Sequence, residues 1–201
     1  MSDELVLGDD GRTRCGWVRA DPDYIAYHDA EWGTPLHGDQ KLFEKISLEG
    51  FQAGLSWITI LRRRPGFRVA FDGFDLERVA GYDERDVERL MGDERIIRNR
   101  AKIDATISNA RVTLELIRED PGALDRLMWG FAPTKRRARP KTWADIPAVT
   151  PESEAMSKAL RGLGYKFVGP TTMYALMQSA GMVDDHLAAC WRAKAAQQTR
   201  A

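Results

Sequence analysis

Four residues near the two ends of the chain are suited to binding a transition metal. His186 and Cys190 are four residues apart, which would place them on one face of the helix that we predict from about Asp184. Cys15 and His28 supply a second pair, giving two sulfur and two nitrogen ligands. Tetrahedral zinc favours this set, and four protein ligands leave no position for a catalytic water. The pattern predicts a structural zinc that joins the chain ends. The alternatives are two buried thiols with two hydrogen-bonded histidines, or a disulfide in an exported protein.

Residues 163–172, with the sequence LGYKFVGPTT, are suited to binding an anion. They lie between two predicted helices, and their glycines permit a tight connection. Pro170 would begin the second helix, whose first backbone N–H groups lack a partner within the helix and can face a phosphate. The segment resembles the helix-hairpin-helix element of DNA repair proteins, which grips phosphates without reading the base sequence. An ordinary helix connection is the alternative. The predicted DNA contacts are Lys166, Gly169, Thr171 and Thr172.

Aromatic side chains and one carboxylate gather in the N-terminal third of the chain. Glu49 lies in an otherwise apolar stretch, where a carboxylate is unfavourable unless it is paired or used in function. Aromatic residues at helical spacing usually belong to a core, so the pattern alone leaves a core role and a binding role open. The aromatic residues are Trp17, Tyr24, Tyr27, Trp32 and Trp57.

The composition limits the classes of function. Lysine plus arginine equals aspartate plus glutamate at 30 each, so the chain lacks the strongly basic character of proteins that bind nucleic acid mainly through charge. A DNA-binding role would therefore use local patches and backbone donors. No apolar run approaches the roughly 18–20 residues that a membrane span needs, and the acidic N-terminus lacks the apolar centre of an export signal. We expect a cytoplasmic protein without a membrane segment, and the sequence offers no sign of a dimer.

Helical patterns dominate, and we expect an all-α fold. Asp39 is placed to cap a helical stretch that Gly50 and Gly54 divide or bend, and Pro65-Gly66 is expected to end it. An apolar stripe at alternating four- and three-residue steps predicts one long helix over residues 98–119. Other helices are expected after the caps Asp75, Asp83 and Thr150, over residues 170–181, and from Asp184, which we interpret as the N-cap of the last helix.

Four motifs together resemble the 3-methyladenine DNA glycosylase I family. They are CGW at 15–17, YHDAEWG at 27–33, LEGFQAGLSW at 48–57 and GYKFVGPTTMY at 164–174. The resemblance implies an atypical helix-hairpin-helix DNA glycosylase fold, with N- and C-terminal segments joined by a structural zinc. It implies a tail over residues 1–13, a helical domain over 14–191 with the hairpin at about 151–181, and a tail over 192–201. The matching zinc ligands are Cys15, His28, His186 and Cys190, and the matching base pocket holds Trp17, Tyr24, Tyr27, Glu49 and Trp57.

The resemblance also implies a chemistry, namely that the enzyme flips 3-methyladenine out of double-stranded DNA and excises it. Methylation at N3 makes the base cationic, so it stacks well on aromatic faces, and we expect Trp57 and Tyr27 to form a slot that Trp17 closes. Glu49, kept ionised, would accept a hydrogen bond from the exocyclic amine and act as the catalytic carboxylate. No lysine stands where bifunctional relatives form a Schiff base, so base removal without strand cleavage is expected.

Three other interpretations of the sequence remain open. The first is a glycosylase of the same fold with a broader range of alkylated purines. The second is a zinc-stabilised helical module that binds DNA or protein without catalysis. The third is a hydrolase in which the zinc is catalytic, against which the four protein ligands argue.

Overall fold

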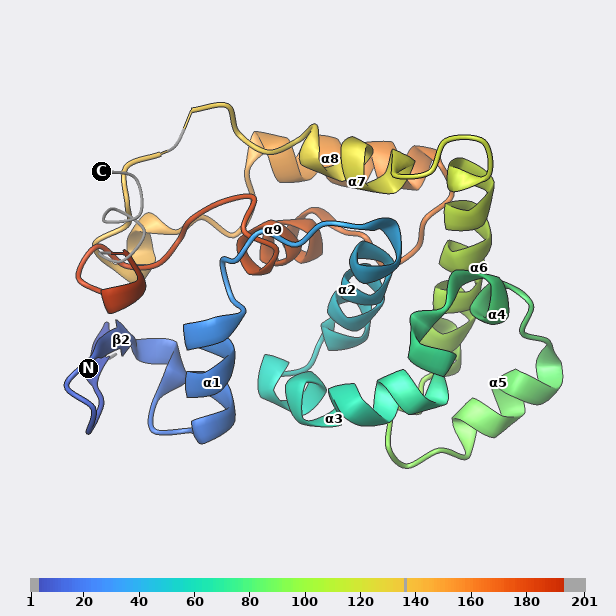
Figure 1. Ribbon diagram of the computed structural model, residues 1–201, viewed down its shortest axis with the longest axis horizontal. Helices are drawn as coiled ribbons and strands as arrows, with labels where there is room; N and C mark the ends of the chain where they lie inside the picture. The colour runs from blue at the N-terminus through green and yellow to red at the C-terminus, as the bar shows by residue number, and fades with distance from the viewer. Residues whose placement is uncertain (1–3, 136, 194–201) are drawn as a thin grey trace. The chain divides into compact units, whose positions relative to one another are not determined.

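The computed structural model describes residues 4–135 and 137–193 and is mostly helical (Figure 1). The chain divides into two compact units. The first consists of residues 1–35, 133–148 and 177–201, and the second of residues 36–132 and 149–176. The prediction of a mostly helical fold is therefore confirmed, and the units are described in turn. Among the described residues, no helix combines the length and the apolar character needed to cross a membrane.

The second unit is built around the long helix α6, Arg100–Ile117, against which α2 and α4 pack. Its core contains five fully buried phenylalanines, three of which lie on or just after α3: Phe67, Phe71 and Phe74, together with Phe43 and Phe51 of α2. The other helices are α2 Asp39–Gln52, α3 Trp57–Ala70, the 3-10 turn η2 Asp72–Phe74, α4 Leu76–Ala80, α5 Glu84–Met91, α7 Ala123–Trp129, α8 Pro151–Gly162 and α9 Pro170–Ser179, which continues into the first unit.

Several of the predicted helix starts are confirmed by side-chain capping. The carboxylate of Asp75 accepts a hydrogen bond from the backbone of Arg78 at the start of α4. Asp83 begins α5 with a reciprocal capping box, and Thr150 does the same for α8. These caps use residues within one turn of the helix start, which is why they can be read from the sequence.

Two predictions about α2 and α3 are wrong. Gly38, not Asp39, is the N-cap of α2, and the Asp39 carboxylate instead accepts hydrogen bonds from the backbone N–H groups of Gly122 and Asp125 at the start of α7. Pro65 lies inside α3 and does not end it. A proline within a helix removes one backbone hydrogen bond, and here the packing of Phe67 and Phe71 against the core compensates for that loss.

The first unit begins with a small β-hairpin. Strand β1, Leu5–Leu7, pairs antiparallel with β2, Thr13–Cys15, so that Leu5 lies opposite Cys15. This hairpin lies in the segment that we predicted to be a tail, and an all-α description omits it. The 3-10 turn η1, Gly16–Val18, and helix α1, Pro22–Ala30, follow, and Asp21 caps α1. The second predicted tail, beyond residue 193, lies outside the described residues.

The C-terminal part of the first unit is less regular than expected. The 3-10 turn η3 spans Trp143–Asp145, and residues 184–187 have no regular secondary structure before a turn at 188–190. The helix predicted from Asp184 is therefore wrong, because the N–H of Ala188 donates to the carbonyl of Pro140 instead of joining a helical ladder. Gly181 holds this segment close to residues 33–35. A Cβ atom on Gly181 would lie 2.7 Å from the backbone nitrogen of Pro35, so only glycine fits.

Candidate functional site

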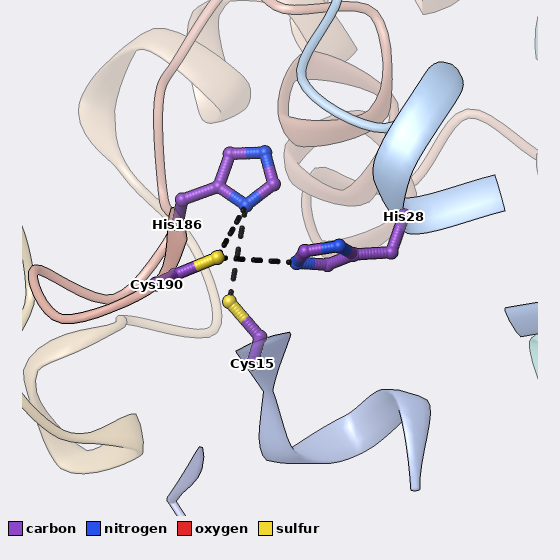
Figure 2. Close-up of side chains that lie close together, drawn as sticks. All are labelled: Cys15, His28, His186 and Cys190. Carbon is purple, nitrogen blue, oxygen red and sulfur yellow. Dashed lines mark hydrogen bonds between the residues drawn. The ribbon is translucent and has the colours of Figure 1, made fainter. Parts of the chain in front are cut away.

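The first unit brings the four predicted metal ligands together. Cys15, at the end of β2, and His28, on α1, meet His186 and Cys190 from the irregular C-terminal segment (Figure 2). All four side chains are buried, and their ligand atoms lie within 4.8 Å of one another. Cys190 Sγ is 3.4 Å from His28 Nε2 and 3.7 Å from His186 Nδ1, which is 3.8 Å from Cys15 Sγ. A tetrahedral zinc with its usual bond lengths requires separations of about 3.3–3.8 Å between ligands, so the residues present fit such an ion.

The ligand set was predicted correctly, but not for the geometric reason given. His186 and Cys190 do not share a helical face, because residues 184–190 are not helical. A turn brings the two side chains together instead. Cys15 and Cys190 are both buried free thiols, which decides against the disulfide alternative.

Both histidines have an outer hydrogen-bond partner that fixes the ring. His28 Nδ1 lies 2.8 Å from the carboxylate of Asp29, and His186 Nε2 lies 3.3 Å from the carbonyl oxygen of Trp32. When the ring N–H faces these acceptors, Nε2 of His28 and Nδ1 of His186 are left to face the centre of the cluster. Metal-binding histidines usually have such partners, which set the tautomer and the ring orientation.

Asp29 is itself held by three donors. Arg14 donates through Nε and Nη2 to its carboxylate, and Trp191 Nε1 donates at 3.1 Å. Burial opposes ionisation of this carboxyl, but the hydrogen bonds from Arg14, His28 and Trp191 outweigh it and lower the pKa of Asp29 to about 2. The carboxylate is therefore ionised and strengthens His28 as a ligand. Arg14 and Asp29 adjoin two of the ligands in the chain, and that adjacency was the signal from which the sequence could have identified them.

The two thiols share a proton unequally. The hydrogen bond between them lowers the pKa of the Cys190 thiol and raises that of Cys15, to which burial also contributes. His186 and His28 add to the decrease at Cys190. A divalent cation would favour the thiolate form of both residues, as metal coordination requires.

The aromatic residues of the first unit pack directly onto this cluster. Trp17 lies edge-to-face against Tyr24 and Tyr27, with ring centroids 5.3 and 6.4 Å away. The same indole lies 5.4 Å from the ring of His28 and 5.3 Å from Trp32. Three predicted base-binding residues, Trp17, Tyr24 and Tyr27, thus form one group, whose position depends on a predicted metal ligand. Trp32 is mainly structural, since it is buried between the two histidines.

The second unit holds the other two predicted base-binding residues. Glu49 lies in the last turn of α2 and is only 3% exposed, whereas Trp57 is half-buried at the first position of α3. A lysine that the sequence analysis missed lies next to both. Lys45 Nζ is 3.2 Å from the Glu49 carboxylate and 4.3 Å from the centroid of the Trp57 ring. The four-residue spacing of Lys45 and Glu49 on a predicted helix was the signal for this pair.

A second buried lysine fixes the turn between Glu49 and Trp57. Lys102, on α6, donates to the carbonyl oxygens of Phe51 and Ala53 at 2.8 and 2.6 Å. These carbonyls end α2, where the negative end of the helix dipole favours a cation. Burial lowers the pKa of Lys102. The sequence analysis also missed this residue, because nothing local marks a contact about fifty positions away.

The predicted phosphate-binding segment connects α8 and α9 and is attached firmly to α6. Asn109 accepts from the backbone N–H of Lys166 and donates to its carbonyl, at 2.8 and 3.0 Å. Tyr165 is buried with its hydroxyl 2.8 Å from Thr113 Oγ1. The Lys166 side chain is exposed, and Thr171 is exposed in the first turn of α9. The four predicted DNA contacts, Lys166, Gly169, Thr171 and Thr172, therefore lie on one rigid connection.

Asp184 has a different role from the predicted one. It forms an ion pair with Arg139 at 2.8 Å, and its neighbour Asp185 pairs with Arg137 at 3.3 Å. The N-cap interpretation of Asp184 is wrong, since no helix begins there. These pairs also engage two arginines of the basic segment that precedes Pro140.

Comparison with known proteins identifies the family. A sequence model described as methyladenine glycosylase matches residues 17–193. The chain is 49% identical over 178 residues to DNA-3-methyladenine glycosylase 1 of Escherichia coli (strain K12), which covers 88% of this chain and 95% of the relative. The chain belongs to the methyladenine glycosylase family.

Solved structures agree with this family assignment. A crystal structure of 3-methyladenine DNA glycosylase I superposes with a TM-score of 0.84 at 47% identity, covering 89% of this chain and 98% of the other. A second, the enzyme from Staphylococcus aureus in a study of 3-methyladenine recognition, gives a TM-score of 0.80 at 34% identity over 86% of this chain and 92% of that one. The predicted family and fold of this methyladenine glycosylase are thus confirmed, whereas the roles of individual residues remain predictions.

Proposed function

We propose that this methyladenine glycosylase excises 3-methyladenine from alkylated DNA by hydrolysing the N-glycosidic bond, which leaves an abasic site. One observation carries the proposal, namely the 49% identity to the E. coli 3-methyladenine glycosylase over nearly the full length of both chains. The released base is a good leaving group, because methylation at N3 gives the attached adenine a positive charge. The enzyme therefore needs mainly to extrude and recognise the base.

We assign recognition of the cationic base to Glu49 and the aromatic side chains. A buried, ionised carboxylate accepts a strong hydrogen bond from the exocyclic amine and favours positive charge on the ring. The face of Trp57 would stack on the base, with Tyr27 opposite and Trp17 and Tyr24 around it. The burial of Glu49 and the packing of Trp17 with both tyrosines support these roles. The family resemblance supports their assignment to a common pocket.

We assign a structural role to the metal and identify it as zinc. The donor set of two thiols and two imidazoles supports zinc, and the outer partners Asp29 and the Trp32 carbonyl support a site built for a metal. When bound, the ion would supply a fixed point that joins four ligands from the two ends of the chain. Four protein ligands leave no position for water, so Cys15, His28, His186 and Cys190 organise the first unit and take no part in hydrolysis.

We assign grip on the DNA backbone to the connection between α8 and α9. The first N–H groups of α9 lack partners within the helix and can donate to a phosphate, and Lys166 adds a positive charge. The double contact of Asn109 with Lys166 supports this role, because it fixes the backbone that would meet the phosphate. Such contacts position the duplex without selecting a base sequence.

Release of bases from methylated DNA tests the proposed activity. The protein is incubated with methylated duplex DNA, and the released bases are separated by chromatography. We expect 3-methyladenine to be released without strand cleavage. Release of 7-methylguanine in similar amounts would favour the broader alkylpurine glycosylase, and release of no base would favour a binding module.

Two matched substitutions on α2 test the role of the carboxylate. Glu49→Gln is expected to lower the rate of release about 10- to 100-fold, because a neutral amide no longer favours the cationic ring. Glu44→Gln makes the same change one turn away, where the carboxylate pairs with Arg68 near the surface, and is expected to leave the rate unchanged. Equal rates for the two folded variants would contradict the assignment of Glu49.

A further inference from the structure

Lys45 contacts both predicted base-recognition residues of the second unit. It lies on α2, one turn before Glu49, and its side chain is about one-tenth exposed. Its ammonium lies 3.2 Å from the Glu49 carboxylate and 4.3 Å from the centre of the Trp57 ring. One cation therefore forms an ion pair with the carboxylate and a cation–π contact with the indole.

This position is energetically meaningful because both charges are buried. A buried ammonium or carboxylate is strongly unfavourable unless an opposite charge lies close to it. The other charged groups on helices packed against α2 are engaged elsewhere in the described contacts. Arg68 of α3 pairs with Glu44, Lys102 of α6 binds two backbone carbonyls, and Asp125 of α7 bonds with His37 and the N–H of Gly38.

We propose that Lys45 is a positioning residue of this glycosylase, which keeps the Glu49 carboxylate ionised and oriented and occupies one face of Trp57. The inference rests on the proposed function for its consequence in catalysis. With the ammonium on one face of the indole, a base can stack only on the other face, so Lys45 also sets the side from which the base enters.

The ion pair has a consequence for how the site recognises charge. Lys45 and Glu49 together carry no net charge, so recognition of a cationic base depends on the direction of the carboxylate more than on a net negative field. The carboxylate also favours the protonated amine, which has no lone pair to attack a sugar carbon. Lys45 is therefore not a Schiff-base nucleophile, in agreement with the expected lack of strand cleavage.

Removing the positive charge should make catalysis sensitive to acid. Lys45→Met and Lys45→Gln leave Glu49 buried without this counter-ion, and such a carboxylate takes up a proton at higher pH than one beside an ammonium. We expect the acidic limb of the pH profile of kcat/KM for 3-methyladenine release to move up by about one pH unit. At alkaline pH both variants should approach the wild-type rate. Lys45→Arg restores the charge and should restore the wild-type profile.

Lys41→Met is the matched control. Lys41 is exposed one turn earlier on the same helix, so this substitution removes the same charge without touching Glu49 or Trp57. Its pH profile should be that of the wild type. An unchanged profile in both Lys45→Met and Lys45→Gln, whatever their overall rate, would overturn the proposal, and so would an arginine variant as acid-sensitive as the methionine variant.

A direct titration separates this inference from the proposed activity. The Glu49 carboxyl carbon is followed by carbon-13 NMR in the protein without DNA, with Glu49→Gln used to assign its signal. We expect the titration midpoint to lie at higher pH in Lys45→Gln than in the wild type and in Lys41→Met. Midpoints that coincide would refute the role of Lys45 even if the enzyme is active. A shifted midpoint in a protein that releases no methyladenine would uphold the ion pair and refute the proposed function.

Discussion

The connection between α8 and α9 depends on a tyrosine that should make the protein sensitive to alkali. Tyr165 is 3% exposed, and its hydroxyl lies 2.8 Å from Thr113 Oγ1 on α6. Thr113 Oγ1 also donates to the carbonyl of Asn109 at 2.7 Å, which leaves the tyrosine hydroxyl as the donor between the two side chains. Burial raises the pKa of Tyr165 to about 12. The folded protein therefore keeps this proton at a pH where the unfolded chain releases it.

The sign and size of the effect follow from that difference. The unfolded tyrosine ionises near pH 10, so the stabilisation is complete below pH 10 and is lost as the pH rises through about 12. A shift of about two units corresponds to about 3 kcal/mol of unfolding free energy, and about 1.4 kcal/mol of it is lost by about pH 11. Tyr82, whose pKa burial also raises, adds its own loss in the wild type.

Urea unfolding of the wild type and of Tyr165→Phe at two pH values isolates this contribution. Unfolding is followed by circular dichroism at about pH 9 and about pH 11. At the lower pH, Tyr165→Phe should be less stable by about 1 kcal/mol because it lacks the hydrogen bond to Thr113. Between the two pH values it should lose about 1.4 kcal/mol less than the wild type. The same loss in both proteins would refute the reasoning, since it would mean that Tyr165 does not hold its proton through burial.

Three further predictions concern the second buried lysine and the metal centre. Lys102→Met should lower the unfolding free energy by about 2–3 kcal/mol in urea, because two buried carbonyls at the end of α2 lose a charged donor; a change below about 0.5 kcal/mol would contradict this. Gly33→Ala should weaken zinc binding in competition with a chromogenic chelator, because its Cβ would lie 3.1 Å from His186 Nε2, whereas Gly11→Ala has nearly the same positive φ and open space around it, so equal weakening would point to backbone strain alone. Asp29→Asn should lower zinc affinity about 10- to 100-fold in the same assay by removing the carboxylate behind His28, and wild-type affinity would exclude that role.

The sequence predicted best the features that local interactions determine. Asp75, Asp83 and Thr150 cap helices whose first turns they contact directly, and the apolar stripe of α6 follows from its own spacing. The metal ligands were found because their types are few in this chain and the family motifs include them. In each case the information lies within a few residues, or in the choice of a rare side chain.

The errors arose where the decisive contact is distant in the sequence. Asp39 has the type and place of an N-cap, yet it caps α7, more than eighty residues away. The segment after Asp184 has residues compatible with a helix, but its backbone bonds to Pro140 and its side chains converge with Cys15 and His28. Lys45 looks like an ordinary charged helix residue until Trp57, beyond the end of its own helix, proves to lie over it.

The first unit explains why the metal ligands come from the two ends of the chain. Three separate segments form this unit, and its regular structure consists of one short helix, a three-residue hairpin and the end of α9. Such segments bury little surface through secondary structure alone, so contacts between them must hold the unit together. An ion bound by Cys15, His28, His186 and Cys190 would close a loop of more than 150 residues, and a cross-link over a loop of that length is worth about 5 kcal/mol by chain entropy. Because Trp17 packs on His28, the same link would fix the aromatic residues assigned to the base. The metal can thus be essential to recognition without taking part in the chemistry.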